Sequence, residues 1–465
     1  LFIGTDNGHI GVTRDGGTTW TDVASRVPQL PPGAWVNSIS ASSSAPGVAY
    51  AAFDRHQVDD YRAYGYVTRD YGRSWQPIQA GLDSYVHVIR DDPRNPSVLY
   101  AGTQTGTYVS LDGGARWQNM QLGIPPVPVF DLQVHPRDND LIVGTHGRGF
   151  YVLDDLAAIQ GLQNARTMAV DLFPPPPATR TLNGLYTEHG RGEFVAENKP
   201  LGASLTFFLA RVPKAAPKSK PVAHIDVDDA RGGLVASFDV PVHAGINRTQ
   251  WDLRETLSPK PVQDARATYI FYPLTISGPR VEPGTYRVRL RSGDAQSTQN
   301  LEVRRDPRGV ADPTGSMAAA AFVRRNDDAQ AVAESIAAAM TSLRKQAAQR
   351  RSKPAEAAAR DLDIVDRFAA HMLDTLRNPE PSGYREAART IEQLAYLRYS
   401  VQQFDGAPTR AQMAAESVYE SQADAAVARS LDFFQSLPAT NARLSAAGVA
   451  PLLIPKISVR MSQRT

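Results

Sequence analysis

The chain has 465 residues, 42% of them hydrophobic, so it is long enough for about three domains and apolar enough to bury a large core. Lysine and arginine total 50 against 48 acidic residues, and this balance gives no sign of a nucleic-acid partner. The absence of cysteine excludes disulfides and thiol nucleophiles, and no apolar run is long enough to predict a membrane span.

Residues 1–155 are predicted to form an all-β meander. Short β-branched and aromatic runs alternate there with Gly, Asp, Asn and Pro. The stretch VTRDGGTTW at Val12 to Trp20 returns as VTRDYGRSW at Val67 to Trp75 and as VSLDGGARW at Val109 to Trp117. The repeats stand 55 and 42 residues apart, which is the period of a four-stranded propeller blade with one long insertion.

Three further parts are predicted to follow. Residues 156–200 read as a proline-rich linker that includes the stiff stretch FPPPPATR. Residues 201–308 contain alternating strands around Gly-containing turns, which favours an immunoglobulin-like β-sandwich. Residues 309–465 are rich in alanine and favour a helical bundle. The predicted fold class is therefore multidomain and mainly β, with a partial β-propeller, a sandwich and a C-terminal helical bundle.

Helical periodicity supports the predicted bundle. Thr409 and Gln412 make a capping box at the start of one expected helix. The basic stretch from Arg344 to Lys353 has no interleaved aromatic residues, so a solvated helix end is expected there rather than a nucleic-acid site. One apolar stripe, with spacings of 3, 4, 3 and 4, consists of Leu362, Val365, Ala369, Met372 and Leu376.

Each copy of the repeated motif has the composition of a folding device. Its glycines permit a tight turn, its aspartate accepts the backbone N–H groups of that turn, and its tryptophan packs between blades. A structural role is therefore expected for Asp15, Trp20, Asp70, Trp75, Asp112 and Trp117.

The motif resembles the Asp-box, or BNR repeat, which runs Ser or Thr, any, Asp, any, Gly, any, Thr or Ser, Trp. The first two copies fit fully, and the third has Arg116 in place of the hydroxyl residue. The order of the predicted parts resembles the large bacterial proteins described as BNR-repeat or sortilin-like glycosyl hydrolases. This resemblance covers essentially the whole chain and implies the C-terminal part of an exported protein, either extracellular or periplasmic. Because Asp-boxes occur in sialidases, xyloglucanases, sortilin-type receptors and non-enzymatic propellers, the resemblance implies a fold rather than a reaction.

Strand direction predicts the face on which a ligand binds. Successive strands of a blade are antiparallel, so the loops after the second strands lie opposite the Asp-box turns. These loops include a long insertion from Asp54 to Tyr64, which is expected to line the ligand-facing surface. The residues predicted to bind ligand are Asp6, Asp54, His56, Tyr61, Tyr64, Gln104, His146 and Arg148.

Two functions stay open. The first is a binding protein that engages a glycan or a protein ligand, and the second is a glycoside hydrolase that uses Asp59 and Asp60 as acid and base. A sialidase is disfavoured, because no glutamate precedes Glu188 and Arg148 is the only arginine that a short turn places on the ligand face. The interpretation leans towards binding because no complete catalytic set is present.

Other signals predict no cofactor and no metal site. His87 and His135 lie in strand patterns and are interpreted as structural. The blades are expected to be completed by an upstream segment or a second chain, because the first unit lacks a preceding strand and the last lacks the tryptophan. Leu1 is accordingly not expected to be the start of the gene product, and the oligomeric state is left open.

Overall fold

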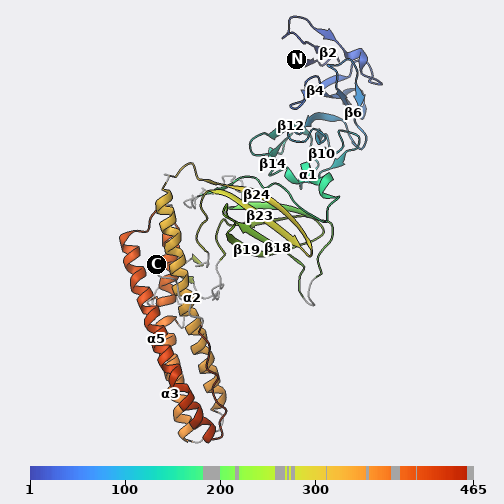
Figure 1. Cartoon of the computed structure of the whole chain (residues 1–465). Coiled ribbons are helices and arrows are strands. Elements are labelled where there is room, and N and C mark those ends of the chain that lie inside the picture. The colour runs from blue at the N-terminus through green and yellow to red at the C-terminus, as the bar shows by residue number, and fades with distance from the viewer. Residues whose placement is uncertain are drawn as a thin grey trace.

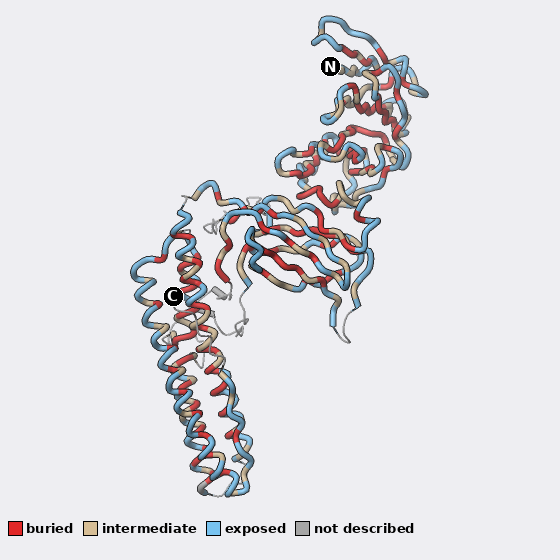
Figure 2. The backbone as a smooth tube through the Cα atoms, viewed as in Figure 1, coloured by how far each residue is buried: buried red, intermediate tan, exposed pale blue. Residues whose placement is uncertain are grey.

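The computed structural model describes residues 1–181, 199–214, 219–256, 268–269, 272–273, 278–309, 312–351, 356–378, 388–404 and 406–457. Figure 1 shows these residues as a string of small β-sheets, then a pair of larger sheets, then long helices. Buried residues run along the strands of both β parts and recur along the helices (Figure 2). The structure is thus a β-rich multidomain fold with a helical C-terminal part.

The β-strands of the first part form four antiparallel sheets in chain order. The two central sheets have four strands each, in the orders β4-β5-β6-β7 and β8-β9-β10-β11. The first sheet (β1-β2-β3) and the last (β12-β13-β14) have three each. The strands are β1 (Phe2–Gly4), β2 (Ile10–Val12), β3 (Thr21–Asp22), β4 (Trp35–Ala41), β5 (Ala49–Arg55), β6 (Asp60–Thr68), β7 (Gln76–Pro77), β8 (Val86–Asp91), β9 (Leu99–Thr103), β10 (Gly106–Ser110), β11 (Gln118–Asn119), β12 (Val129–His135), β13 (Asp140–Thr145) and β14 (Phe150–Leu153). Two short 3-10 helices lie between them, η1 (Ala24–Arg26) and η2 (His56–Val58).

Two of the three motif tryptophans are buried against the preceding sheet, and the third is partly exposed. Trp75 is buried in one apolar core with Ile10 of the preceding sheet, and Trp117 is buried with Ile78 of its own preceding sheet. The Trp117 indole N–H also donates to the Ile78 carbonyl oxygen. Trp20, in contrast, keeps 43% of its surface exposed. Each buried motif tryptophan therefore joins its own sheet to the one before it.

The motif aspartates close the turn before the last strand of each of the first three sheets. Oδ1 of Asp112 accepts the Arg116 backbone N–H at 2.9 Å, and Asp15 and Asp70 make the equivalent bond at 2.9 Å each. In the second copy the Ser74 hydroxyl also donates to Asp70 at 2.7 Å. Arg116 occupies the equivalent position in the third copy and has no hydroxyl to give. These bonds give each aspartate a structural role within its own turn.

The second β part is a sandwich of two sheets that share one apolar core. One sheet has the order β15-β17-β20, and the other has the order β16-β24-β23-β18-β19. β16 pairs in parallel with β24, and the other pairs in these sheets are antiparallel. The strands are β15 (Val170–Leu172), β16 (Ala178–Arg180), β17 (Ala203–Leu209), β18 (Val222–Asp228), β19 (Leu234–Pro241), β20 (Gly245–Trp251), β23 (Gly284–Ser292) and β24 (Ala295–Arg305). A separate two-stranded pair consists of β21 (Thr268–Tyr269) and β22 (Tyr272–Pro273).

The linker predicted over residues 156–200 is wrong where the structure describes that range. Helix α1 (Ala157–Ala165) begins directly after the last small sheet, and β15 and β16 belong to the two sheets of the sandwich. The stretch from Pro174 to Pro177 carries the chain from one sheet to the other, a path that suits residues with a fixed φ and no N–H to pair. Residues 182–198 of the predicted linker lie outside the described residues.

The C-terminal part is built from four helices in the residues described after Asp312. They are α2 (Pro313–Arg350), α3 (Glu356–Leu376), α4 (Thr390–Val401) and α5 (Arg410–Ala446). The stripe predicted from Leu362 to Leu376 is buried in their shared core, and the capping box of Thr409 with Gln412 is present at the start of α5. Lys353, at the end of the predicted basic stretch, lies outside the described residues. Among the helices described, none is long and apolar enough to cross a membrane.

Candidate functional site

Three consecutive sheets carry a β-bulge at the same place in their first strand. In β4 the pairing with β5 passes over Asn37, in β8 the pairing with β9 passes over His87, and in β12 the pairing with β13 passes over Phe130. A bulge leaves its extra residue out of the ladder and aims that side chain in a new direction. Asn37, His87 and Phe130 are therefore equivalent positions of three successive sheets.

The three bulge residues meet in a line across the sheets. Nδ2 of Asn37 lies 3.0 Å from Nδ1 of His87, and the rings of His87 and Phe130 pack edge to face with centroids 4.3 Å apart. Phe130 in turn stacks on His146, which follows β13, with centroids 5.1 Å apart. The bulges thus align side chains that are far apart in the sequence.

A second branch extends this line towards the β5–β6 turn. Tyr85 packs edge to face on His87 at 5.2 Å and stacks on His56 at 5.1 Å, and Tyr61 leans on Tyr85 at 6.3 Å. We refer to the connected set as the aromatic row. It consists of His56, Tyr61, Tyr85, His87, Phe130 and His146.

The aromatic row combines a buried base with an exposed surface. Tyr85 and His87 are buried, whereas Tyr61 is 57% exposed and Phe130 is 49% exposed. His146 is also exposed. Large aromatic side chains that stay exposed while their neighbours hold them in place are typical of binding surfaces.

His87 is held as a neutral donor and acceptor. Burial, the largest effect, lowers the pKa of His87 below its ordinary value of 6.5. The Asn37 amide donates to Nδ1, and Nε2 lies 3.1 Å from Oε1 of Gln104, which accepts its proton. The predicted ligand residue Gln104 is therefore already engaged, and its role is to fix the His87 ring.

Asp54 and His56 form a tight pair beside Tyr85. Asp54 is buried, and its carboxylate accepts the His56 backbone N–H at 2.9 Å and lies 2.6 Å from His56 Nδ1. Because a carboxylate only accepts, Nδ1 carries a proton, and Nε2 is left for a hydrogen bond to another group. Asp54 thus orients the imidazole of His56 and does not itself present a surface to a ligand.

The predicted role of Asp60 as an acid or base is not supported by its surroundings. Arg62 donates to its carboxylate twice at 2.8 Å, and Arg55 and the Tyr64 hydroxyl donate at 3.3 and 2.8 Å. The hydrogen bonds from Arg62 are the largest reason why the pKa of Asp60 lies far below its usual range. A carboxylate that stays ionised cannot supply a proton, and the four hydrogen bonds that its oxygens accept from side chains oppose a role as base, so Asp60 holds the turn together.

The predicted ligand-binding role of Tyr64 is not supported either, because its side chain is buried. It is only 5% exposed, and burial raises the pKa of its hydroxyl to about 12. Its ring cannot stack on an external ligand. The insertion from Asp54 to Tyr64 is likewise not a free loop, since β5 runs to Arg55 and β6 begins at Asp60, with only η2 and Asp59 between them. Asp59 remains exposed at the tip with a positive φ of 55°.

The remaining predicted ligand residues lie at the rim of this face. Asp6 is exposed in the β1–β2 turn and Arg148 is exposed in the β13–β14 turn. Within residues 1–181 no hydrogen bond, ion pair or ring contact joins either of them to the aromatic row. No cluster of three His, Asp or Glu side chains able to hold a metal occurs among the described residues.

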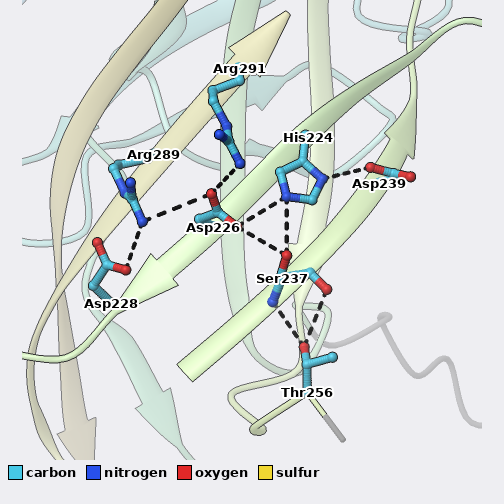
Figure 3. A network of polar contacts seen from close by, with 8 residues as sticks. All are labelled: His224, Asp226, Asp228, Ser237, Asp239, Thr256, Arg289 and Arg291. Carbon is cyan, nitrogen blue, oxygen red and sulfur yellow. Dashed lines mark hydrogen bonds and ion pairs between the residues drawn. The ribbon is translucent and has the colours of Figure 1, made fainter. Parts of the chain in front are cut away.

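A different polar cluster covers the outer face of the sandwich. Oγ of Ser237 lies 3.0 Å from Nε2 of His224, and Nδ1 of His224 lies 2.7 Å from Asp239, which is the order of a catalytic triad (Figure 3). Oδ1 of Asp226, however, lies 3.0 Å from both His224 Nε2 and Ser237 Oγ. Because Asp226 competes for both groups, the cluster isolates no Ser–His pair that could act as nucleophile and base.

No family model matches the chain. No curated protein matches it either. Similar solved structures include YCF48 bound to D1 peptide, which is 19% identical, with 33% of this chain and 47% of that chain covered and a TM-score of 0.26. An ancestral GH74 enzyme is 13% identical, with coverages of 65% and 39% and a TM-score of 0.23. The BSP domain of a biofilm associated protein is 6% identical, with coverages of 58% and 30% and a TM-score of 0.15. The chain spans less than half the length of each of these structures, and similarity at this level carries no function across.

The sequence contains a signal for the aromatic row that motif reasoning missed. The segments WVNS, YVHV and VFDL each place one residue, Asn37, His87 or Phe130, directly after a buried or half-buried valine at the start of a strand. The alternation of side chains along a strand assigns that residue to one face of its sheet. It does not reveal that the bulge turns the side chain towards the next sheet. His87, interpreted as structural from its strand pattern, lies at the centre of the row.

Proposed function

We propose that the chain is a binding protein whose ligand lies along the aromatic row. The observation that carries this proposal is the contact of the three bulge residues, which joins side chains from three separate sheets into one connected row. A continuous line of rings suits an extended ligand better than a small one, because each sheet adds one further contact.

We propose a glycan as that ligand. The exposed rings of Tyr61 and Phe130 offer flat apolar faces to sugar rings, and His56 Nε2 offers a hydrogen bond to a sugar hydroxyl. Arg148 and Asp6 at the rim supply further polar groups. The same rings also suit a protein ligand, which is the alternative that the experiment below distinguishes.

The contacts favour binding over glycoside hydrolysis. Hydrolysis requires a carboxylic acid that gives up a proton and a second carboxylate across the scissile bond. Asp60 is enclosed by two arginines and Asp54 is engaged by His56, so Asp59 is the one predicted carboxylate near the row that is exposed at the tip. A single exposed carboxylate does not make the pair that the reaction needs.

The finer fold assignments belong to the same proposal. We propose that the three repeated turns are Asp-boxes of an exported propeller protein, with the propeller part ending at about residue 155. The parallel pairing of β16 with β24 and the two-sheet order support an immunoglobulin-like sandwich, which begins at β15 rather than at residue 201.

Glycan-array and peptide-array binding of the full chain tests this function. Phe130→Ala and Tyr61→Ala are expected to weaken glycan binding, while the matched variant Phe150→Ala is expected to leave it unchanged, since Phe150 is 82% exposed but lies outside the row. Peptide binding with the same pattern of loss would replace the glycan by a protein ligand. If all three variants bind the glycan as well as the wild type does, the proposed site along the aromatic row is wrong.

A further inference from the structure

A pocket of about 730 Å³ lies where the small sheets meet the sandwich. Its walls come from the turns that follow β8 and β12, from α1, from the proline stretch before β16, and from β17 and β20. The turns after β8 and β12 lie at the opposite end of their strands from the aromatic row. The pocket is therefore separate from the surface proposed above, and junctions of this kind are common places for small-ligand sites.

Helix α1 fixes both sides of this pocket. Leu156, just before α1, is fully buried in the core of the last small sheets, and Ala165 packs with Phe173 next to the sandwich. The Gln160 side chain donates to Asp92 at 2.8 Å and to Asn139 at 2.8 Å. Because α1 is hydrogen-bonded to the small sheets and packs against Phe173 next to the sandwich, the pocket walls hold a defined shape.

Two buried polar atoms of the pocket lining lack a partner. Oγ of Ser204 and Oε1 of Gln250 are buried and accept or donate no hydrogen bond. They belong to directly opposed residues of β17 and β20. A buried polar atom without a partner carries a cost of desolvation, which a ligand that supplies the missing hydrogen bond recovers.

Three acids of the pocket lining form ion pairs with cations of the same lining. Lys199 lies 2.6 Å from Asp140 and 3.1 Å from Asp154, and Arg137 lies 2.8 Å from Asp138. Burial is the largest effect on Asp155 and raises the pKa of its carboxyl, while the charges of Arg248 and Lys199 act in the opposite direction. Asp138, Asp140 and Asp154 are thus each paired with a cation of the lining.

Two arginines, in contrast, bond neutral oxygens. Arg248 donates to the Thr206 hydroxyl at 3.1 Å and to the Asp154 carbonyl at 3.2 Å, and Arg94 donates to the Pro136 carbonyl at 3.3 Å. An arginine has five N–H donors, so both keep donors for a carboxylate. Arg94 and Arg248, whose charge also acts on Asp155, are therefore lining cations with donors left for an anionic ligand.

We propose that this pocket binds a small hydroxylated carboxylate of the hexuronic-acid class. Its carboxylate pairs with Arg248 or Arg94, its hydroxyl groups satisfy Ser204 and Gln250, and its ring lies against the wall from Pro174 to Pro177. The proposal is independent of the aromatic row, so either can fail without the other.

Calorimetric titration of the full chain with D-glucuronate and D-galacturonate tests this site, with D-glucose and acetate as the neutral and the hydroxyl-free probes. At least one uronate is expected to bind, and both glucose and acetate are expected to bind at least about tenfold more weakly, because each lacks one set of contacts. Equal binding of glucose or acetate, or no binding of either uronate, would overturn the proposal.

Three variants locate the site. Arg248→Gln and Gln250→Leu are expected to weaken uronate binding by about tenfold or more, and the exposed control Arg211→Gln is expected to leave it unchanged. Gln250→Leu removes a buried oxygen that has no partner, so its thermal unfolding temperature is expected to equal or exceed that of the wild type. Uronate binding that survives in both pocket variants places the ligand elsewhere and contradicts the proposal.

Discussion

The amide nitrogen of Asn37 lies 3.0 Å from Nδ1 of His87, so the bulges of two successive sheets are joined by a side-chain contact. Bulges usually adjust a single strand, whereas these bulges connect neighbouring sheets into one surface. The contact also fixes the tautomer of His87, which in turn supports Tyr85 and Phe130. Order in the aromatic row therefore depends on a buried, neutral imidazole.

Acid is expected to weaken this arrangement through His87. Burial lowers the folded-state pKa of His87 below 6.5, so the unfolded chain binds its proton more readily than the folded chain does. Stability from this group is fully present above the unfolded pKa and falls as the pH drops from about 7 to about 5. The thermal unfolding temperature is expected to fall as the pH drops across this range, and the fall is expected to be smaller in the His87→Gln variant. An identical pH profile in the two proteins would show that His87 does not titrate this way.

The motif tryptophans provide a direct comparison of burial. Trp117→Ala is expected to lower the free energy of unfolding of the β-sheet part by about 3–5 kcal/mol, because a nearly fully buried ring leaves a cavity. Trp20→Ala is expected to cost less than about 1 kcal/mol, because this ring is already 43% exposed. Urea unfolding monitored by hydrogen exchange separates the β part from the helices. Equal losses in the two variants would mean that Trp20 is covered in solution.

The third motif turn lacks one hydrogen bond that the second has. Ser74 donates its hydroxyl to Asp70, whereas Arg116 cannot donate one to Asp112. Arg116→Ser is therefore expected to stabilise the protein by about 0.5 kcal/mol, and Asp112→Ala to destabilise it by about 1 kcal/mol through the lost Arg116 N–H bond. Denaturant midpoints measure both changes. A stabilising Asp112→Ala would contradict the structural role of the aspartate.

The exposed and enclosed aspartates of the β5–β6 turn should respond differently to substitution. Asp60→Asn is expected to lower the unfolding temperature, because Arg55 and Arg62 lose their ionised partner. Asp59→Asn is expected to leave it nearly unchanged, since Asp59 is exposed at the tip. If the protein hydrolyses a glycan and Asp59→Asn abolishes this activity, the result would instead favour the glycoside hydrolase.

Much of the architecture could be predicted because local rules and tertiary packing agree there. The stripe from Leu362 to Leu376 forms a buried helix face, and Thr409 with Gln412 caps α5. The prediction of a linker fails over Pro174 to Pro177, because a proline stretch that crosses between two sheets has the same composition as a linker.

The candidate site was harder to predict, because its key features depend on partners far along the chain. Tyr64 is buried in one core with Ile10 of the preceding sheet, and nothing near Tyr64 in the sequence reveals that burial. The contact between His87 and Phe130 requires two bulges to face each other, which alternation in either strand alone does not encode.

Histidine NMR of the full chain tests the central claim most directly. The chain has 9 histidines, and those of the row can be assigned from single substitutions. Titration with a glycan selected on the array is expected to shift the ring signals of His56 and His146, while those of His224 on the sandwich and His371 on α3 stay in place. Saturable binding that leaves the His56 and His146 signals unmoved would contradict a ligand site along the aromatic row.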